Sequence, residues 1–342
     1  MLTRFNYKKS FCSLADKKSM ERYVKGYVAR RFELGDILND NVTSIITHTK
    51  IYEERSAYTT KLYEYESYLQ PGNLVLVGGY PGIGKSNLIY DMVKELYCWR
   101  RKSVAIFSLA SNEQQVILEL LSRMVGCDIC RLRNDLLYED EWDRLVERLV
   151  SLLEGSSSHN LFIDTTPYMT IEYLERSLGS FYIEGCNCAF VDYIQLMEVY
   201  GNTPFQNNFE KMSHISHNLK QLAKSLNIPI VVVCQVHCMA RDCKQPPYSL
   251  NDFCDCGTLV EDADVVMMVD RPEIYNVFQD KHGRDLHGVT IIPVLKDRNG
   301  NPFRQIELFW EPSRREYITL FDHIHGTGEL LPSKINDITN IY

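Results

Sequence analysis

One stretch of the chain, residues 73–87, combines residue types that bind phosphate groups. Its sequence is NLVLVGGYPGIGKSN, and the part from Gly79 to Ser86 fits the pattern G-x-x-x-x-G-K-[ST]. Glycines let the backbone curl so that successive N–H groups point inward at phosphates, and the following helix adds its positive N-terminal end. Because an apolar strand precedes the turn and an apolar helical stretch (residues 88–96) follows it, we expect a nucleoside triphosphate site rather than a plain glycine turn.

The residues of this loop have separate expected roles. Lys85 would reach the outer phosphates, and the Ser86 hydroxyl would ligate the Mg²⁺ that bridges them. The expected nucleotide-binding residues are Gly79, Pro81, Gly82, Ile83, Gly84, Lys85, Ser86 and Asn87.

Two polar residues downstream end apolar strands. Asp192 suits the second carboxylate that holds Mg²⁺ through water, although a strand-terminal Asp is common. Gln235 follows the run IPIVVVC, where its amide would either sense the γ-phosphate or cap the strand end. From these positions we expect Lys85, Asp192 and Gln235 to be catalytic residues, and Asp192 also to hold the metal ion.

The elements that position these residues form an alternating series. We expect strands at residues 74–77, 103–109, 161–164, 188–192, 229–234 and 265–269, followed by a hairpin formed by residues 289–295 and 304–309. Helical periodicity covers residues 88–96, 113–124, 139–153, 171–178 and 209–226, the second of these being capped by Ser111 or Asn112. Continuous Val/Ile runs suit a sheet covered on both faces. The sequence therefore predicts an α/β domain with a mainly parallel central sheet and a C-terminal β-hairpin over residues 56–320, a helical N-terminal arm over 1–55, and a C-terminal tail over 321–342.

Composition limits the class of protein. The chain has 342 residues, 45% of them hydrophobic and 24% charged, with a net charge of −8 and eleven cysteines. No run of 18 apolar residues occurs, and the first 18 residues lack an apolar signal core, so we expect no membrane insertion and a cytoplasmic location. The cysteines are then expected to be reduced thiols or metal ligands. The charge argues against a broadly basic nucleic-acid-coating surface but permits a basic groove or pore.

Beyond the phosphate loop, several motifs occur in a recognisable order. They are LQPG (69–72), IFSL (106–109), IDTTP (163–167), VDYIQLM (191–197), LKQLAK (219–224), NIP (227–229), GTLVEDAD (257–264) and KDRNG (296–300). Over about residues 57–318 the chain resembles the C-terminal, RecA-like motor domain of DnaB-type replicative helicases. The DYIQLM and EDAD stretches are far more specific than a phosphate loop.

The resemblance implies a hexameric homo-oligomeric ring that hydrolyses ATP or another NTP between subunits and draws single-stranded DNA through its centre. Lys296 and Arg298 fall on the family's basic pair, in which an Arg neutralises phosphoryl charge in the neighbouring site; the alternative is a hairpin tip in solvent. The family's pore loops correspond to residues 198–208 and 236–256. The expected DNA-binding residues are Arg241, Lys244, Asp255 and Gly257. Replication, phage or mobile-element proteins are further expected partners.

Three departures from the family matter. The family's catalytic Glu is replaced by Ala110, which cannot orient a water. Glu113 could take over this role only if the turn between strand and helix is remodelled. Otherwise Glu113 is a residue of the first helical turn, where the helix dipole favours a carboxylate. The second pore loop reads CDCG (254–257), without the family's Arg. About 55 N-terminal residues cannot hold the family's collar domain, but they could form an arm that docks on the next subunit. A zinc site is a further hypothesis, with candidate ligands His237, Cys238, Cys243, Cys254 and Cys256.

The leading interpretation is a DnaB-like ring ATPase and helicase on single-stranded DNA. One alternative is a degenerate ATP-binding scaffold or regulatory subunit with weak or no hydrolysis, which Ala110 and Cys254 favour. Another is a RecA- or KaiC-like ATPase of recombination or signalling, against which the DYIQLM motif counts.

Overall fold

The computed structural model describes residues 65, 67–134, 136–154, 159–200, 205, 207–236, 249–256, 258–300 and 304–319, with the side chains of 147–154 and 254–255 excepted. The expected N-terminal arm and C-terminal tail lie outside these residues. Their assignment therefore stays a prediction.

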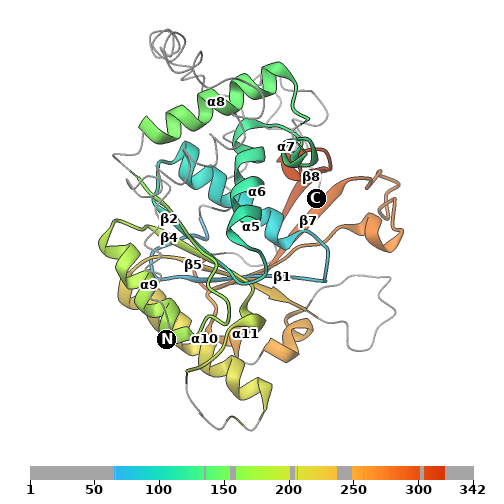
Figure 1. Ribbon diagram of the computed structural model, residues 1–342. Coiled ribbons are helices and arrows are strands. Elements are labelled where there is room, and N and C mark those ends of the chain that lie inside the picture. Colours follow the sequence, from blue (N-terminus) through green and yellow to red (C-terminus); the bar gives the residue numbers. More distant parts are fainter. Residues whose placement is uncertain are drawn as a thin grey trace.

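A nine-stranded sheet forms the centre of the described chain (Figure 1), with the order β3-β2-β4-β5-β1-β6-β7-β8-β9. The parallel strands are β1 (Leu74–Gly79), β2 (Val104–Ser108), β3 (Leu161–Asp164), β4 (Cys188–Asp192), β5 (Ile230–Gln235) and β6 (Val265–Met268). The strands β7 (Val289–Asp297), β8 (Gln305–Glu311) and β9 (Glu316–Thr319) continue the sheet antiparallel. The predicted mainly parallel α/β fold is confirmed, and β9 adds a third strand to the expected hairpin.

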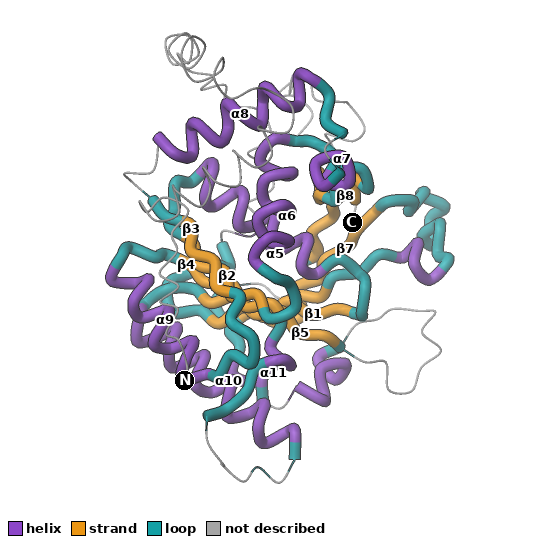
Figure 2. The backbone as a smooth tube through the Cα atoms, in the orientation of Figure 1, coloured by secondary structure: helices purple, strands orange, loops and turns teal. Residues whose placement is uncertain are grey.

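Helices cover both faces of the sheet, as Figure 2 shows. One face carries α5 (Lys85–Lys94) with its π-helical extension η2 (Glu95–Trp99), α6 (Glu113–Val125), α7 (Ile129–Arg133) and α8 (Glu139–Glu154). The other face carries α9 (Ile171–Ile183), α10 (Asn208–Leu226) and α11 (Leu259–Asp262). Short 3₁₀ turns complete the described chain: η3 (Ile194–Leu196), η4 (Leu250–Cys256) and η5 (Pro272–Tyr275). Each face buries its own hydrophobic cluster, which is why the central strands are apolar on both sides.

Side-chain caps fix where the helices next to the site begin. Asn112, one of the two predicted caps, accepts from the Gln115 N–H at 2.9 Å, and the Gln115 side chain accepts from the Asn112 N–H at 3.2 Å. This reciprocal capping box satisfies N–H groups that the first helical turn leaves unpaired. Asn207 caps α10 in a similar way, and Asn227, with φ of 53°, ends it. These caps hold the loops between strand ends and helices in place.

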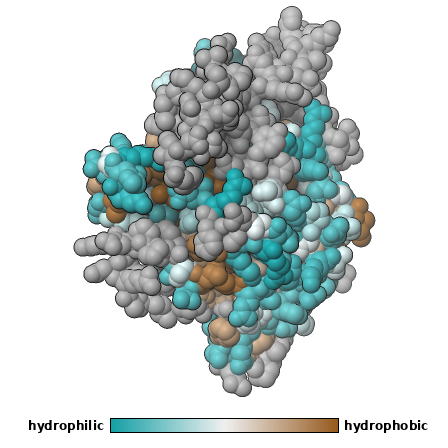
Figure 3. Space-filling view, turned by 180° about the vertical axis from the view of Figure 1, so that it is seen from behind, coloured by the Kyte–Doolittle hydropathy of each residue, from teal (hydrophilic) through white to brown (hydrophobic). Residues whose placement is uncertain are grey.

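The described surface seen from behind is mostly hydrophilic, with smaller hydrophobic areas between polar ones (Figure 3). Among the described helices none has the length and apolar character needed to cross a membrane.

Candidate nucleotide-binding site

The loop between β1 and α5 has the backbone geometry expected of a phosphate loop. Gly82 and Gly84 adopt φ angles of 74° and 110°, which favour glycine, so the chain curls tightly before the first turn of α5. Lys85 is buried, and its Nζ donates to the carbonyl oxygens of Gly79 at 2.9 Å and Tyr80 at 2.8 Å. Burial lowers the pKa of Lys85 to about 8, while the nearby carboxylate of Asp192 acts in the opposite direction. The ammonium group is thus held inside the curl of the loop.

Parallel pairing brings the other predicted residues to the same edge of the sheet. Gly79 lies beside Gln235 in the β1–β5 register, and Ser108 lies beside Asp192 in the β2–β4 register. Because parallel strands end on one side, the phosphate loop, Asp192 and Gln235 meet there. The fold thus brings these residues to one edge, and their roles toward a nucleotide stay a prediction.

The oxygen atoms at this edge suit a magnesium ion. Burial raises the pKa of Asp192, and a hydrogen bond from the Ser86 hydroxyl and the charge of Lys85 oppose that rise. The hydroxyl of Ser108 is buried and has no hydrogen-bond partner among the described residues. A carboxylate and hydroxyl groups are hard oxygen ligands of the kind Mg²⁺ takes. Ser86 and Asp192 would hold the ion, directly or through water.

The Gln235 backbone is clamped by a side chain that sequence reasoning did not assign. Gln195 Nε2 donates to the Gln235 carbonyl oxygen at 2.7 Å, and the Gln235 N–H donates to Gln195 Oε1 at 3.2 Å. Gln195 therefore ties the turn after β4 to the end of β5. The DYIQLM motif contains this residue, so its position in the motif was the available signal.

A cleft of about 460 Å³ opens beside the phosphate loop. Residues from several elements line it, among them Lys85, Ser86, Gln115, Glu119, Arg133 and Arg315. Neither Ala110, which is exposed after β2, nor Glu113 is part of that lining.

The carboxylate of Glu119 in this lining is already engaged. Its Oε2 lies 2.6 Å from Arg123 Nη1 and its Oε1 lies 2.8 Å from Arg315 Nη1. These two charge-assisted contacts occupy both carboxylate oxygens with guanidinium groups. Both oxygens are thus engaged, and we do not assign Glu119 to the activation of water.

Behind the loop, the C-terminal strand supports α5. Tyr317 Oη lies 3.2 Å from the Gly84 carbonyl oxygen, and the Tyr317 N–H donates to Asp91 Oδ2 at 2.7 Å. Arg123, whose side chain is fully buried, donates to Asp91 Oδ1 at 3.0 Å and to the Arg315 carbonyl oxygen at 2.5 Å.

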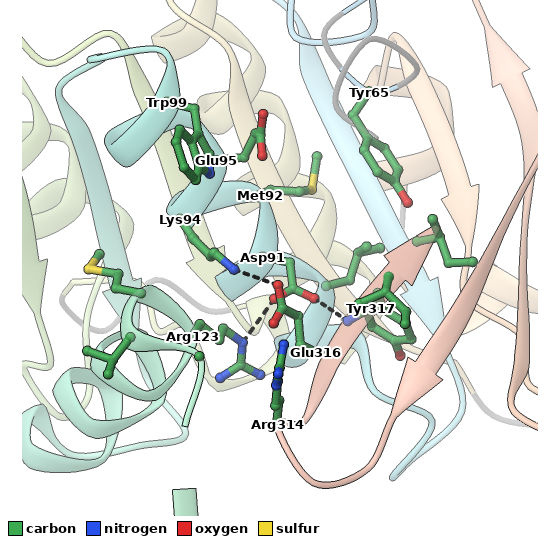
Figure 4. Close-up of a pocket in the computed structure, with 16 residues that line it drawn as sticks. Tyr65, Asp91, Met92, Lys94, Glu95, Trp99, Arg123, Arg314, Glu316 and Tyr317 are labelled. Atoms are coloured by element: carbon green, nitrogen blue, oxygen red, sulfur yellow. Dashed lines mark hydrogen bonds and ion pairs between the residues drawn. The ribbon is translucent and has the colours of Figure 1, made fainter. Parts of the chain in front are cut away.

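Figure 4 shows these side chains converging beside a cavity of about 320 Å³, where Lys94 also pairs with Glu316. The ion pairs link α5, α6 and β9 into one support for the phosphate loop. Sequence reasoning did not identify Arg123, Arg315 or Tyr317.

Lys296 and Arg298 lie at the opposite edge of the sheet from their own phosphate loop. Asp297 pairs with Val265 at the start of β6, and Val265 pairs with Val75 near the start of β1. Gly79 lies four positions after Val75 in β1, which at about 3.3 Å per residue is roughly 13 Å along the strand.

Comparison with known proteins decides the family. A sequence model described as the DnaB-like helicase C terminal domain matches residues 56–319. The chain belongs to this family.

Curated relatives and solved structures agree with this assignment. The replicative DNA helicase DnaB of Buchnera aphidicola subsp. Baizongia pistaciae is 30% identical over 244 residues, which cover 71% of this chain and 50% of that protein. The DnaB helicase of Helicobacter pylori is 33% identical over 222 residues, covering 64% of this chain and 43% of the relative. The chain thus spans about half the length of these curated relatives.

Two solved structures have the same fold. One is described as an ATPase domain, and it has a TM-score of 0.65 and 19% identity over 84% of this chain and 100% of that one. The other is a DnaB-like replicative helicase whose structure concerns its interactions with primase, with a TM-score of 0.65, 19% identity and coverage of 90% of this chain and 75% of that one.

In this DnaB-like domain several predicted residues fall outside the described part of the chain. They are Arg241, Lys244, His237, Cys238, Cys243 and Gly257, and the side chains of Cys254 and Asp255 are likewise not described. Cys256 is described, and its sulfur lies 2.6 Å from that of Cys234 at the end of β5. Within the described residues no group of three or more His, Cys, Asp or Glu could hold a metal ion. The DNA contacts and the zinc hypothesis remain predictions.

Proposed function

We propose that this chain is the motor of a ring-forming helicase that binds ATP with Mg²⁺ and translocates on single-stranded DNA. The observation that carries the proposal is the placement of two sets of polar residues at opposite edges of the sheet. Lys85, Ser86, Asp192 and Gln235 belong to the carboxyl edge of the sheet, whereas the basic pair Lys296 and Arg298 belongs to the other edge.

This placement favours a head-to-tail assembly. A basic pair about 13 Å along the strand from its own phosphate loop reaches a nucleotide only when that nucleotide is bound by another copy. Contacts between unlike edges of successive copies are heterologous, and they close into a ring when the rotation permits. A hexamer is the ring we propose.

Each residue then has a defined task. Lys85 pairs with the outer phosphates, and Ser86 and Asp192 hold Mg²⁺, which when bound neutralises phosphate charge. Gln235, fixed by Gln195, contacts the γ-phosphate from the strand end. Arg298 from the next subunit meets the charge that develops on the transferred phosphoryl group.

Activation of water is the step for which this sequence departs from its family. Ala110 cannot accept a proton, and both oxygens of Glu119 are held by guanidinium groups. Glu113, in the first turn of α6, is the candidate we propose for this role, acting once a bound nucleotide draws the turn inward.

DNA contacts are proposed for the two segments that follow β4 and β5. Arg241 and Lys244 would pair with phosphates, and Asp255 and Gly257 would line the second segment. Contacts to the backbone rather than to bases suit a protein that moves along DNA of any sequence.

The test is steady-state ATP hydrolysis by the purified chain, with and without single-stranded DNA. Lys85→Ala should abolish DNA-stimulated turnover, and Glu113→Gln should reduce it by at least about a hundredfold if Glu113 orients the water. Glu175→Gln, an exposed carboxylate on α9 at the other face of the sheet, is the matched control and should leave turnover unchanged.

Tight Mg²⁺-ATP binding without turnover above the Lys85→Ala background would overturn the motor proposal and leave an ATP-held scaffold. DNA-stimulated turnover without strand displacement on a forked duplex would instead indicate a recombination or signalling ATPase.

A further inference from the structure

The basic pair at the far edge is held by a specific set of acceptors. Arg298 Nη1 lies 3.0 Å from Asp264 Oδ1, and the Arg298 N–H donates to the Asp264 carbonyl oxygen at 2.9 Å. Asp264 thus contacts both the backbone and the guanidinium group of Arg298. Its own side chain is almost fully buried, while the Arg298 side chain is 48% exposed. The arrangement anchors one end of Arg298 and leaves its outer face at the surface.

The carboxylate of Asp264 is itself fixed on its other oxygen. Asp264 Oδ2 accepts from the Leu74 N–H at 2.8 Å and pairs with the ammonium group of Lys220. Lys220 in turn donates to the Gly72 carbonyl oxygen at 3.0 Å. Because Oδ2 is held by β1 and α10, Oδ1 has a set direction toward Arg298. A fixed acceptor restricts the rotamers of a long side chain and so lowers the entropy lost when that side chain later binds a phosphate.

The same edge connects to the segment proposed to contact DNA. Lys296 Nζ donates to the carbonyl oxygens of Val260 at 2.8 Å and Glu261 at 3.0 Å, and Arg298 Nη2 donates to the Glu261 oxygen at 3.3 Å. Both carbonyl groups belong to α11, which begins shortly after η4. A shift of α11 would therefore move the acceptors of both cations together.

We propose that Asp264 is a positioning residue that aims Arg298 at the nucleotide bound by the next subunit. The proposal rests on the trans role assigned to Arg298 above and adds the group that sets its direction. Lys220 and the Leu74 N–H orient the carboxylate, and the α11 carbonyl oxygens hold Lys296 beside it. Asp264 touches no nucleotide and acts through Arg298.

A subunit-mixing experiment separates this role from a structural one. Asp264→Asn keeps the size of the side chain but removes the charge that holds the guanidinium group. Alone, this variant should bind Mg²⁺-ATP with a dissociation constant within threefold of wild type and hydrolyse it at least tenfold more slowly, an effect on kcat rather than on KM. Mixed with Lys85→Ala, it should regain activity, because Lys85→Ala subunits lack a working phosphate loop but offer an intact Arg298 to their neighbours.

The size of the rescue can be stated in advance. In a random one-to-one mixture, about a quarter of the interfaces of a ring join an Asp264→Asn phosphate loop to a Lys85→Ala subunit's basic pair. Hydrolysis should therefore rise toward about a quarter of the wild-type rate. Activity that stays at the level of the two separate variants would overturn the proposal that Asp264 positions Arg298 for the next subunit.

A second mixture, a control variant and a replacement variant complete the design. Arg298→Ala mixed with Lys85→Ala tests the trans role itself. Rescue of this mixture without rescue of Asp264→Asn refutes only the positioning role, whereas rescue of neither mixture refutes the trans assignment as well. Asp262→Asn is the matched control, because its carboxylate accepts from Ser216 at 2.6 Å and Thr258 at 3.0 Å rather than from the basic pair; it should stay active alone. If Asp264→Asn does not fold, Asp264→Asn combined with Lys220→Met removes the buried charge left behind and undergoes the same rescue test.

Discussion

The contact between Gly84 and Tyr317 tests how the C-terminal strand supports the phosphate-binding loop. A Cβ atom added at Gly84 would lie 2.1 Å from Tyr317 Oη and 3.3 Å from its Cζ, at a backbone φ of 110°. Gly84→Ala therefore combines a steric clash with an unfavourable backbone conformation. The first effect depends on the Tyr317 hydroxyl and the second does not.

The magnitudes follow from these two effects. Overpacking of this kind costs about 1–3 kcal/mol, and a non-glycine residue held at an unfavourable positive φ costs about 1–3 kcal/mol more. Gly84→Ala should thus lower the free energy of unfolding by about 2–6 kcal/mol. Tyr317→Phe alone should cost about 1 kcal/mol, since it removes one hydrogen bond to the loop carbonyl groups. In the double variant the clash is gone, while the backbone cost and the lost hydrogen bond remain, so the two changes should couple favourably by about 1–3 kcal/mol.

The assay is urea-induced unfolding of the four proteins, followed by circular dichroism and analysed as a double-mutant cycle. Gly82→Ala is the control, because it has a φ of 74° but no heavy atom within 4 Å of the added Cβ. Its cost should be the same with Tyr or Phe at position 317. Additive effects of Gly84→Ala and Tyr317→Phe, within about 0.5 kcal/mol, would refute the reasoning, because they would mean that the strand does not press on the loop.

Three other predictions concern the same region. Burial raises the pKa of Asp91 to about 6 against the opposing charge of Arg123. Between about pH 4 and pH 6 the folded state therefore keeps a proton on Asp91 that the unfolded state has lost. Wild type consequently loses stability as pH rises from about 4 to about 7. The stability of Asp91→Asn relative to wild type should rise by about 2–3 kcal/mol over that range in urea titrations, and a pH-independent difference would contradict the assignment. Gln195→Leu should lower the free energy of unfolding by about 1–3 kcal/mol, because it leaves the Gln235 N–H and C=O without the partners described above; a loss below about 0.5 kcal/mol would show that these groups find other partners. Ser86→Ala should raise the Mg²⁺ concentration needed for half-maximal ATP binding by about tenfold or more, since one oxygen ligand is lost; an unchanged requirement in equilibrium dialysis would remove Ser86 from the metal site.

Local sequence determined much of the fold and the centre of the site. A short apolar run indicates each strand of the parallel sheet, because a strand buried on both faces carries apolar side chains along most of its length. The phosphate loop is equally local, since its glycines and Lys85 act through the backbone of one turn. Asp192 and Gln235 could be placed beside it because parallel strands all end at the same edge. Sequence alone therefore sufficed for what depends on one element or on strand direction.

Tertiary structure decided which distant elements support that centre. Arg123 lies on an ordinary helical face, and its partner Arg315 is 192 positions away in the sequence. Arg315 directly precedes β9, a strand too short to show a clear periodic pattern. Lys296 and Arg298 are far from their own phosphate loop both in sequence and in space. Their distance from it in space depends on β7 running antiparallel to β6. Asp264 holds Arg298 only because β6 lies between β1 and β7 in the sheet order. Such contacts follow from strand order and from packing between elements, and a local pattern of residues records neither.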